Sequence, residues 1–291
     1  MPHSFLSAAT VATIGLTCKA VLKLGLCSMT VNGLPILLDA LESGERAQGR
    51  GVVTVSNHIS TLDDPLTWGI MPARTYLRSR LTRWSLGASD IMFTNPVFST
   101  FFRHGQVLET FRGKGIYQPA VNAAIEKLGK GDWIHLFGEG KICQPETYAH
   151  TGGIAQLQRF KWGVGRILLE TPCPPTIIPM WLTGFERLMP EGRTFPYNFV
   201  PRLGARLSVT FGEPVRFEDI TAALGRLTAA LPDASGGEAS GGPNLAGPSA
   251  DGPADTEWQR LARSEVTAVI QRAVEALGRT VSGDMLGKSS P

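Results

Sequence analysis

The chain has 291 residues, a formal net charge of +3, and charged side chains at only 18% of its positions. It is long enough to bury the core of one α/β domain or two small ones. The small net charge and the absence of a lysine- and arginine-rich run argue against a nucleic-acid partner. Four scattered cysteines, with no Cys-x-x-Cys pair, argue against a metal site. The shortage of charge suggests a surface that is not wholly in water.

The first predicted element is an apolar segment at the N-terminus. From Phe5 to Val31 the residues are mostly apolar or small, interrupted by Lys19 and Lys23, and the first acidic residue is Asp39. The uninterrupted apolar part is shorter than the roughly 20 residues that span a bilayer as a helix. A secretory signal would need a basic start, and a transit peptide would need arginines. We therefore expect residues 1–38 to form a membrane-associating helix at the lipid interface, with a buried core helix as the alternative.

Residues 39–231 alternate between strand and helix patterns. Between the second and third strands, Pro119 begins a helix whose apolar residues recur at spacings of three and four, and glycines end it at Gly129. The predicted strands cover residues 52–55, 105–109, 133–137, 177–182 and 207–211. Strands separated by helices of this length predict an α/β fold: a mixed, largely parallel sheet with helices packed against it.

The C-terminal part changes in composition. Residues 232–256 consist mainly of Gly, Pro, Ala, Ser and Asp, with Leu245 as the one bulky apolar residue. Such a segment buries too little to offset the entropy lost on ordering, so we expect a disordered low-complexity insert. Residues 257–291 predict an amphipathic helix that ends at Gly278, followed by a tail.

The strongest motif for chemistry follows the first predicted strand of this region. Asn57–Pro65 contains His58 and Asp63 in the pattern His-x-x-x-x-Asp. At the end of a strand, where α/β ligand sites usually lie, four intervening residues let the Asp63 carboxylate turn back onto the imidazole. The carboxylate would then fix the histidine tautomer and stabilise the imidazolium. The alternative is structural, because Asp63 or Asp64 could simply cap the helix that Pro65 begins.

Two further glycine-containing loops follow predicted strands. Arg112 and Gly113 suit a loop that approaches a phosphate, which arginine binds with two parallel hydrogen bonds. The glycines of Gly138–Gly140 free the backbone to bring Glu139 close to a ligand. Each loop could also be an ordinary turn. In a largely parallel sheet, however, both would share one rim with His58.

An aromatic region extends from Trp181 to Pro201 and includes two arginines. Aromatic rings mixed with arginine are typical of a bilayer interface, although core packing explains many such rings equally well. The residues expected to contact a membrane are Trp181, Phe185, Phe195 and Phe199.

Four segments resemble, in order and spacing, the four motifs of the glycerophospholipid acyltransferase superfamily. They are Asn57-His58-x-Ser60-x-x-Asp63, Phe111-Arg112-Gly113, Phe137-Gly138-Glu139-Gly140 and Ile178-Pro179. Longer matches, which include Arg112–Gln118, Gly131–Phe137 and Arg159–Arg166, are similar to the tafazzin family within it. The resemblance extends from about residue 10 to about residue 220.

The resemblance implies a transacylase that moves fatty acyl chains between phospholipids and lysophospholipids, cardiolipin among them, without coenzyme A or another cofactor. It also implies mitochondrial membranes facing the intermembrane space as the location. By the same resemblance, His58 is the catalytic base and Asp63 orients it. The residues then expected to bind the phosphate or headgroup are Asn57, Ser60, Arg112, Gly113, Glu139 and Gly140.

One position departs from the family pattern, whose third motif usually reads Phe-Pro-Glu-Gly. Gly138 stands here in place of proline, which is expected to loosen the turn that holds Glu139. Two other functions stay open: an acyl-coenzyme-A-dependent lysophospholipid acyltransferase that uses the same residues, and a membrane protein that binds lipid without catalysis. A serine hydrolase is disfavoured because the chain has no Gly-x-Ser-x-Gly motif. The sequence carries no signal for an oligomeric state.

Overall fold

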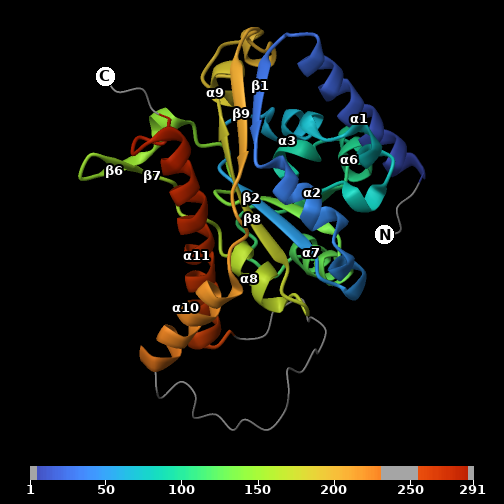
Figure 1. Ribbon diagram of the computed structural model, residues 1–291. Helices are drawn as coiled ribbons and strands as arrows, with labels where there is room; N and C mark the ends of the chain where they lie inside the picture. The colour runs from blue at the N-terminus through green and yellow to red at the C-terminus, as the bar shows by residue number, and fades with distance from the viewer. Residues whose placement is uncertain (1–4, 231–254, 288–291) are drawn as a thin grey trace.

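The computed structural model describes residues 5–230 and 255–287. Within these ranges the chain forms a seven-stranded sheet in the order β1-β9-β8-β2-β5-β3-β4 and a separate two-stranded hairpin of β6 and β7 (Figure 1). Neighbouring strands of the large sheet are parallel, apart from the antiparallel pair β8–β9. The prediction of a mixed, largely parallel sheet is therefore confirmed. The strands are β1 (Ser28–Asn32), β2 (Val52–Ser56), β3 (Trp84–Ala88), β4 (Val107–Thr110), β5 (Trp133–Phe137), β6 (Ala149–Thr151), β7 (Ile154–Gln156), β8 (Thr176–Thr183) and β9 (Arg206–Phe211).

Helices cover both faces of the sheet because its central strands are apolar on both sides. On β5, for example, Ile134 and Leu136 join one buried cluster, whereas Trp133 joins the other. The first cluster contains α7 (Pro119–Gly129), α8 (Gly163–Glu170), α10 (Phe217–Ala230) and α11 (Glu257–Ser282). The second contains α1 (Phe5–Lys23), α2 (Leu34–Glu42), α3 (Asp63–Thr67), α4 (Ala73–Tyr76) and α9 (Phe185–Leu188). The short helices α5 (Ser89–Met92) and α6 (Pro96–His104) connect β3 to β4 at one edge of the sheet.

The N-terminal helix α1 lies against the domain. By length and composition it could cross a membrane, and only 17% of its apolar window is buried. Close contacts hold it in place: Gly15 faces the ring of Tyr76, and Lys19 Nζ donates to the carbonyl of Met71 at 2.8 Å. After α1 the chain enters β1, an edge strand that was not predicted from the sequence. The apolar N-terminal segment therefore supplies both a helix and a strand of the sheet.

The C-terminal helix differs from its prediction at one end. It continues through Gly278 to Ser282 rather than ending at the glycine. A Cβ atom at this position would lie 2.7 Å from the ring of Trp181. Gly278 is therefore a packing residue that lets α11 approach β8. The predicted low-complexity insert lies outside the described residues, apart from Asp255 and Thr256.

The expected membrane contacts after β8 need correction. Trp181 and Phe185 are 1% and 0% exposed. Alternate side chains of β8 point into the two cores, and Trp181 lies in the first of them. Phe185, on α9, lies in the second. Neither ring can reach a bilayer in this structure. Phe195 is 80% exposed and stays a candidate. The side chain of Phe199 lies outside the described part of the chain.

Candidate active site

The candidate site lies at the rim formed by the carboxyl ends of the parallel strands. His58 follows β2, Glu139 follows β5 and Arg112 follows β4, and all three strands run in the same direction. Their loops therefore emerge at the same rim, as expected from the sequence. Turns at this rim are where α/β proteins usually bind ligands.

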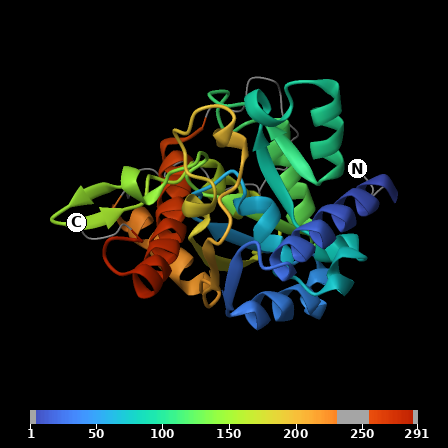
Figure 2. The same cartoon turned by 90° about the horizontal axis from the view of Figure 1, so that it is seen from above.

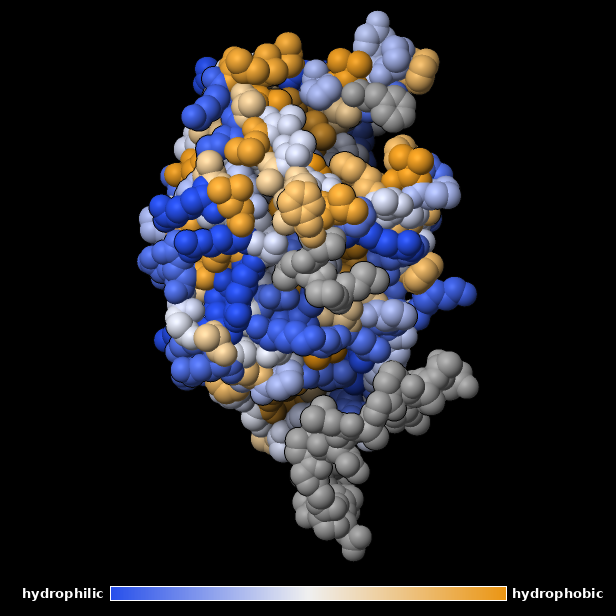
Figure 3. All heavy atoms as spheres, turned by 90° about the vertical axis from the view of Figure 1, so that its right-hand side faces the viewer, coloured by the Kyte–Doolittle hydropathy of each residue, from blue (hydrophilic) through white to orange (hydrophobic). Residues whose placement is uncertain are grey.

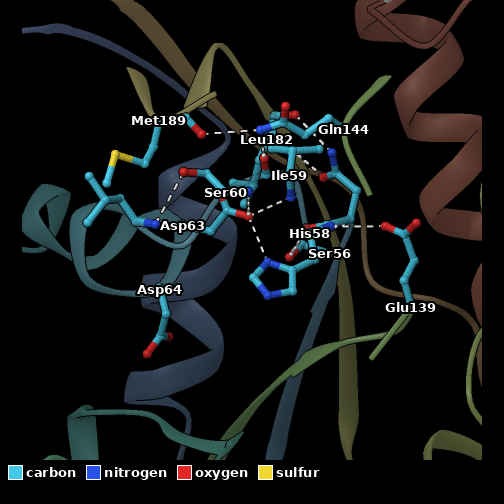
Figure 4. A network of polar contacts seen from close by, with 12 residues as sticks. Ser56, His58, Ile59, Ser60, Asp63, Asp64, Glu139, Gln144, Leu182 and Met189 are labelled. Atoms are coloured by element: carbon cyan, nitrogen blue, oxygen red, sulfur yellow. Dashed lines mark hydrogen bonds and ion pairs between the residues drawn. The ribbon is translucent and has the colours of Figure 1, made fainter. Parts of the chain in front are cut away.

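The turn from β2 into α3 brings His58 and Asp63 together (Figure 4). Nδ1 of His58 lies 2.9 Å from Oδ2 of Asp63. The same oxygen accepts hydrogen bonds from the backbone N–H groups of Ile59 at 2.7 Å and Ser60 at 2.9 Å. The carboxylate thus closes the turn around itself and receives the imidazole. It does not cap α3, which begins without a side-chain cap.

Burial decides how strongly this pair interacts. The Asp63 side chain is 0% exposed, and that of His58 is 20% exposed. Burial raises the pKa of Asp63 above its usual range, against the hydrogen bonds from His58, Ser60 and Ile59, which lower it. A buried and more basic carboxylate is a strong acceptor for an imidazole N–H. The pair is therefore built to hold a histidine proton at Nδ1.

The ring of His58 is also fixed from its face. It stacks on Phe137, with centroids 4.1 Å apart and planes inclined by 22°. With Nδ1 bound to Asp63, the imidazole presents Nε2 at its opposite edge. This arrangement suits a general base, since one nitrogen is occupied and the other can take up a proton.

The neighbouring carboxylate, Asp64, has a different partner and points away from the imidazole (Figure 4). Two guanidinium nitrogens of Arg83 and the indole N–H of Trp68 donate to it. Burial raises the pKa of Asp64, but the charge and hydrogen bonds of Arg83 outweigh this effect and hold the pKa below its usual range. Asp64 is thus an ionised anchor for α3. The sequence motif alone does not reveal Arg83 as its partner.

Asn57 and Ser60, which were expected to bind substrate, position the turn instead. The Asn57 amide donates to the carbonyl of Leu182 at 3.0 Å and accepts from its N–H at 2.9 Å. Ser60 Oγ accepts from the N–H of Leu62. Both residues are buried, at 1% and 0% exposure. Their polar groups serve the backbone, so the expectation of direct substrate contact is wrong for this structure.

Glu139 is likewise turned inward. Its Oε1 accepts the backbone N–H of His58 at 3.0 Å, while the His58 carbonyl accepts from Cys143 N at 2.6 Å. The loop after β5 therefore holds both backbone groups of the histidine. The Glu139 side chain is fully buried, and this burial raises its pKa to about 7. Glu139 therefore holds the backbone of His58 from the buried side of the turn. Its side chain cannot contact a headgroup, contrary to expectation.

The glycine that replaces proline in this loop is tightly packed. A Cβ at Gly138 would lie 2.3 Å from the ring of Phe160. The Gly138 N–H also donates to the Ser56 carbonyl at 3.3 Å. The expected loosening of the turn is therefore offset by the aromatic ring that occupies the space. Gly140 is exposed and has a positive φ of 69°, a conformation that favours glycine.

Arg112 and Gly113 lie at the same rim without contacting the His58 turn. Arg112 forms an ion pair with Asp90 at 3.3 Å, and its side chain is 48% exposed. Gly113 has a φ of 77° and open space around it. The Gln118 side chain holds the loop by accepting from Phe111 N at 2.8 Å. The arginine therefore stays available to an anionic group at the surface.

Gln144 belongs to the site although no sequence motif points to it. Its Nε2 donates to the carbonyls of Ile59 and Met189, at 3.1 and 3.2 Å. It thereby ties the catalytic turn to the segment after β8. Only its three-dimensional contacts reveal this role.

Among the described residues, no group of three or more His, Cys, Asp or Glu side chains could hold a metal ion.

Comparisons with known proteins agree with this geometry. Residues 40–183 match the Acyltransferase family model. The chain is 34% identical to the protein named Taffazin of Dictyostelium discoideum, over 74% of this chain and 72% of that protein. It is 39% identical to Tafazzin of Drosophila melanogaster, over 65% of this chain and 47% of that protein. It is also 38% identical to the N-acylphosphatidylethanolamine synthase of Arabidopsis thaliana, over 66% and 65% of the two chains. The chain therefore belongs to the tafazzin family, and it is a phospholipid acyltransferase.

Proposed function

We propose that this acyltransferase is a phospholipid–lysophospholipid transacylase that needs no coenzyme A. The observation that carries the proposal is the buried Asp63 carboxylate bound to Nδ1 of a partly exposed His58. This pair activates a hydroxyl group for attack on an ester and requires no covalent enzyme intermediate.

The reaction begins when His58 Nε2 removes the proton from a free glycerol hydroxyl of a lysophospholipid. The resulting oxygen attacks the ester carbonyl carbon of a neighbouring phospholipid. When the tetrahedral intermediate collapses, the bond to the donor glycerol oxygen breaks, and His58 returns the proton to that oxygen. Asp63 stabilises the imidazolium between the two proton transfers. One ester replaces a similar ester, so the exchange is close to thermoneutral.

The headgroup binds at the same rim through Arg112. In this proposal the lipid phosphate replaces Asp90 as the partner of the guanidinium. Half-exposure of Arg112 and the open space around Gly113 support this exchange. A phosphate accepts two parallel hydrogen bonds from arginine, which strengthens the contact. Gly113 and Gly140 then leave room for the headgroup beside the backbone.

The family relationship and the apolar helix α1 support a membrane location. We propose that α1 lies at the surface of a mitochondrial membrane facing the intermembrane space. Cardiolipin and other glycerophospholipids of that membrane are the proposed substrates. Only 17% of the apolar window of α1 is buried in the protein, which leaves most of it for lipid.

The test is acyl exchange by purified protein in mixed micelles of acyl-labelled phosphatidylcholine and monolysocardiolipin, so that the labelled product, cardiolipin, differs from the donor. Labelled acyl chains should move to the lysolipid without coenzyme A, and His58→Ala should lower the rate by about 10³-fold. The control is His150→Ala, because His150 lies exposed on the hairpin strand β6.

The same assay separates the other functions. Exchange that occurs only with acyl-coenzyme A would identify a coenzyme-dependent acyltransferase and contradict the proposal. Binding of lipid without turnover under either condition would indicate a non-catalytic role. Labelled N-acylphosphatidylethanolamine, formed when phosphatidylethanolamine is present, would show an amine acceptor in place of the hydroxyl.

A further inference from the structure

An apolar surface lies at the edge of the sheet, on the segment of chain that connects β3 to β4. None of the residues of α5 and α6 is buried. Several large apolar side chains point outward, with 75% exposure at Val97 and 50% at Phe98. We call this surface the phenylalanine edge, and its members are Ile91, Val97, Phe98 and Phe101. Clusters of exposed apolar side chains usually mark a site of interaction.

The rings of the edge are held in a fixed arrangement. The side chain of Asn95 accepts from the N–H of Phe98 at 2.9 Å and begins α6. Phe102, which is half-buried, contacts Phe101 and Phe98 with ring centroids 5.2 and 6.5 Å away. The outward rings thus rest on an inner ring and on a capped helix. They are presented to a partner without large rearrangement.

The edge continues into the N-terminal end of α1. Ser7 Oγ donates to the carbonyl of His104, the last residue of α6, at 2.9 Å. The adjacent side chains Phe5 and Leu6 are 85% and 61% exposed. Figures 1 and 2 both show α6 beside this part of α1. On the face that carries both helices, apolar side chains gather mainly in the upper half (Figure 3).

The charge of this surface fits an anionic lipid. No acidic residue occurs in α1 or between Ile91 and Leu108. Arg103 and His104 lie in the last turn of α6, and Arg103 forms an ion pair with Glu109 at 2.9 Å. Two carboxylates flank this stretch, and each pairs with an arginine: Asp90 of α5 with Arg112, and Glu109 with Arg103. Apolar rings beside arginines, with the neighbouring carboxylates paired, suit the headgroup boundary of an anionic bilayer.

We propose that the phenylalanine edge and the N-terminal end of α1 together insert into the interface of an anionic phospholipid bilayer. This inference rests on the proposed function, because a transacylase must reach lipids in a membrane. The helix α5 begins directly after β3, at the same rim as His58. Docking through the edge therefore turns the catalytic rim toward the headgroups. A second copy of the chain would cover the same rings but would close this route to lipid.

The first test places an environment-sensitive fluorophore on the edge. Phe101→Cys is labelled with nitrobenzoxadiazole in a Cys173→Ser background, because the other native cysteines are buried. With vesicles of phosphatidylcholine and cardiolipin, emission should shift to the blue and be quenched by lipids with nitroxide-labelled chains. The matched control is Phe217→Cys on α10, on the opposite side of the molecule and with a side chain of similar exposure (Figure 1).

Two outcomes of this test would overturn the proposal. In one, the label at position 101 stays in water with vesicles present, like the label at position 217. In the other, the label at 101 is already protected without vesicles and its emission depends on protein concentration, which would show a second copy on the edge.

The second test measures affinity for the same vesicles. The double variant Phe98→Ser/Phe101→Ser should bind roughly tenfold more weakly, whereas Phe217→Ser should bind as the wild type does. Phe98→Trp/Phe101→Trp should keep the wild-type affinity, because tryptophan suits the interface, and denaturation of the serine variant without lipid excludes a folding defect. Unchanged binding of the serine variant would contradict the proposal. His58→Ala should still bind vesicles, so a failure of the transacylase function is distinguishable from a failure of the docking surface.

Discussion

The catalytic turn and the phenylalanine edge distribute polarity in opposite ways. In the turn, Asn57, Ser60, Asp63 and Glu139 are at most 1% exposed. At the edge, phenylalanine rings are about half exposed. Both arrangements run against the usual preference for apolar interiors and polar surfaces. The two functional parts of this enzyme therefore lie where the ordinary pattern of burial is reversed.

The two reversals are stabilised differently. The buried side chains of the turn form hydrogen bonds within the protein, as Asn57 does with Leu182 and Glu139 with the His58 N–H. Only the second oxygens of Asp63 and Glu139 lack a hydrogen-bond partner among the described residues of the turn. The rings of the edge bury little apolar area against the rest of the chain. The cost of exposing them to water is removed only when a partner outside the chain covers them. We therefore expect substitutions in the turn to affect folding and catalysis. Substitutions at the edge should affect membrane binding alone.

The largest effect that would sharpen this contrast is expected at Asp63. Asp63→Asn keeps the size of the side chain but presents an amide to the imidazole, which favours the wrong histidine tautomer. The rate of acyl exchange should fall by about 10³-fold. Asp64→Asn is the matched control, since its partner is Arg83; it should lower the melting temperature while the folded protein keeps most of its activity. Equal losses of activity in the two variants would erase the distinction between the two carboxylates.

The next effect concerns the packing of the turn. Gly138→Pro places ring atoms where Phe160 already lies and removes the N–H that donates to Ser56. The free energy of unfolding should fall by about 4 kcal/mol, measured by urea denaturation. Adding Phe160→Leu should recover part of this loss. If Gly138→Pro alone leaves stability unchanged, the turn is looser than its contacts indicate.

A third effect depends on pH and arises at Glu139. Its pKa of about 7 lies above the value of about 4.3 for an unfolded glutamate, so the folded state binds the proton more tightly. The resulting stability is fully present below about pH 4.3 and is lost as the pH rises through about 7. Glu139→Gln should remove this dependence, with a difference of about 4 kcal/mol between acidic and mildly alkaline pH. Melting curves across that range test it, with the exposed Glu191→Gln as the control for one lost charge.

The smallest effect is expected at the edge. Phe98→Ser/Phe101→Ser should change the free energy of unfolding by less than about 0.5 kcal/mol in the absence of lipid. Chemical denaturation of the variant and the wild type measures this difference. A loss of several kcal/mol would mean that the rings stabilise the fold itself, and the contrast between turn and edge would break down.

Sequence patterns predicted the parts of the fold that depend on local composition. Local pattern alone predicts β2 from its β-branched run, β5 from its apolar run and α7 from its helical spacing. Strand β1 was missed because it lies within a continuous apolar segment, where strand and helix look alike. Strand β3 was missed because Ser85 and Gly87 interrupt its apolar pattern.

The candidate site divides in the same way. The His58–Asp63 pair was predicted, because the six residues of one turn determine it. The inward roles of Asn57 and Glu139 could not be predicted, because their partners come from other strands of the sheet. Trp181 and Phe185 were misplaced because aromatic composition does not reveal which side of a strand or helix faces the core.

The contact between Gly138 and Phe160 constrains how this sequence could change over generations. A mutation that introduces proline at 138 while the ring is present meets a steric barrier. A smaller residue at 160 must arise first or at the same time, and by itself it leaves an empty space in the core. The two positions therefore form an epistatic pair. The order in which they mutate determines whether the intermediate variant still folds.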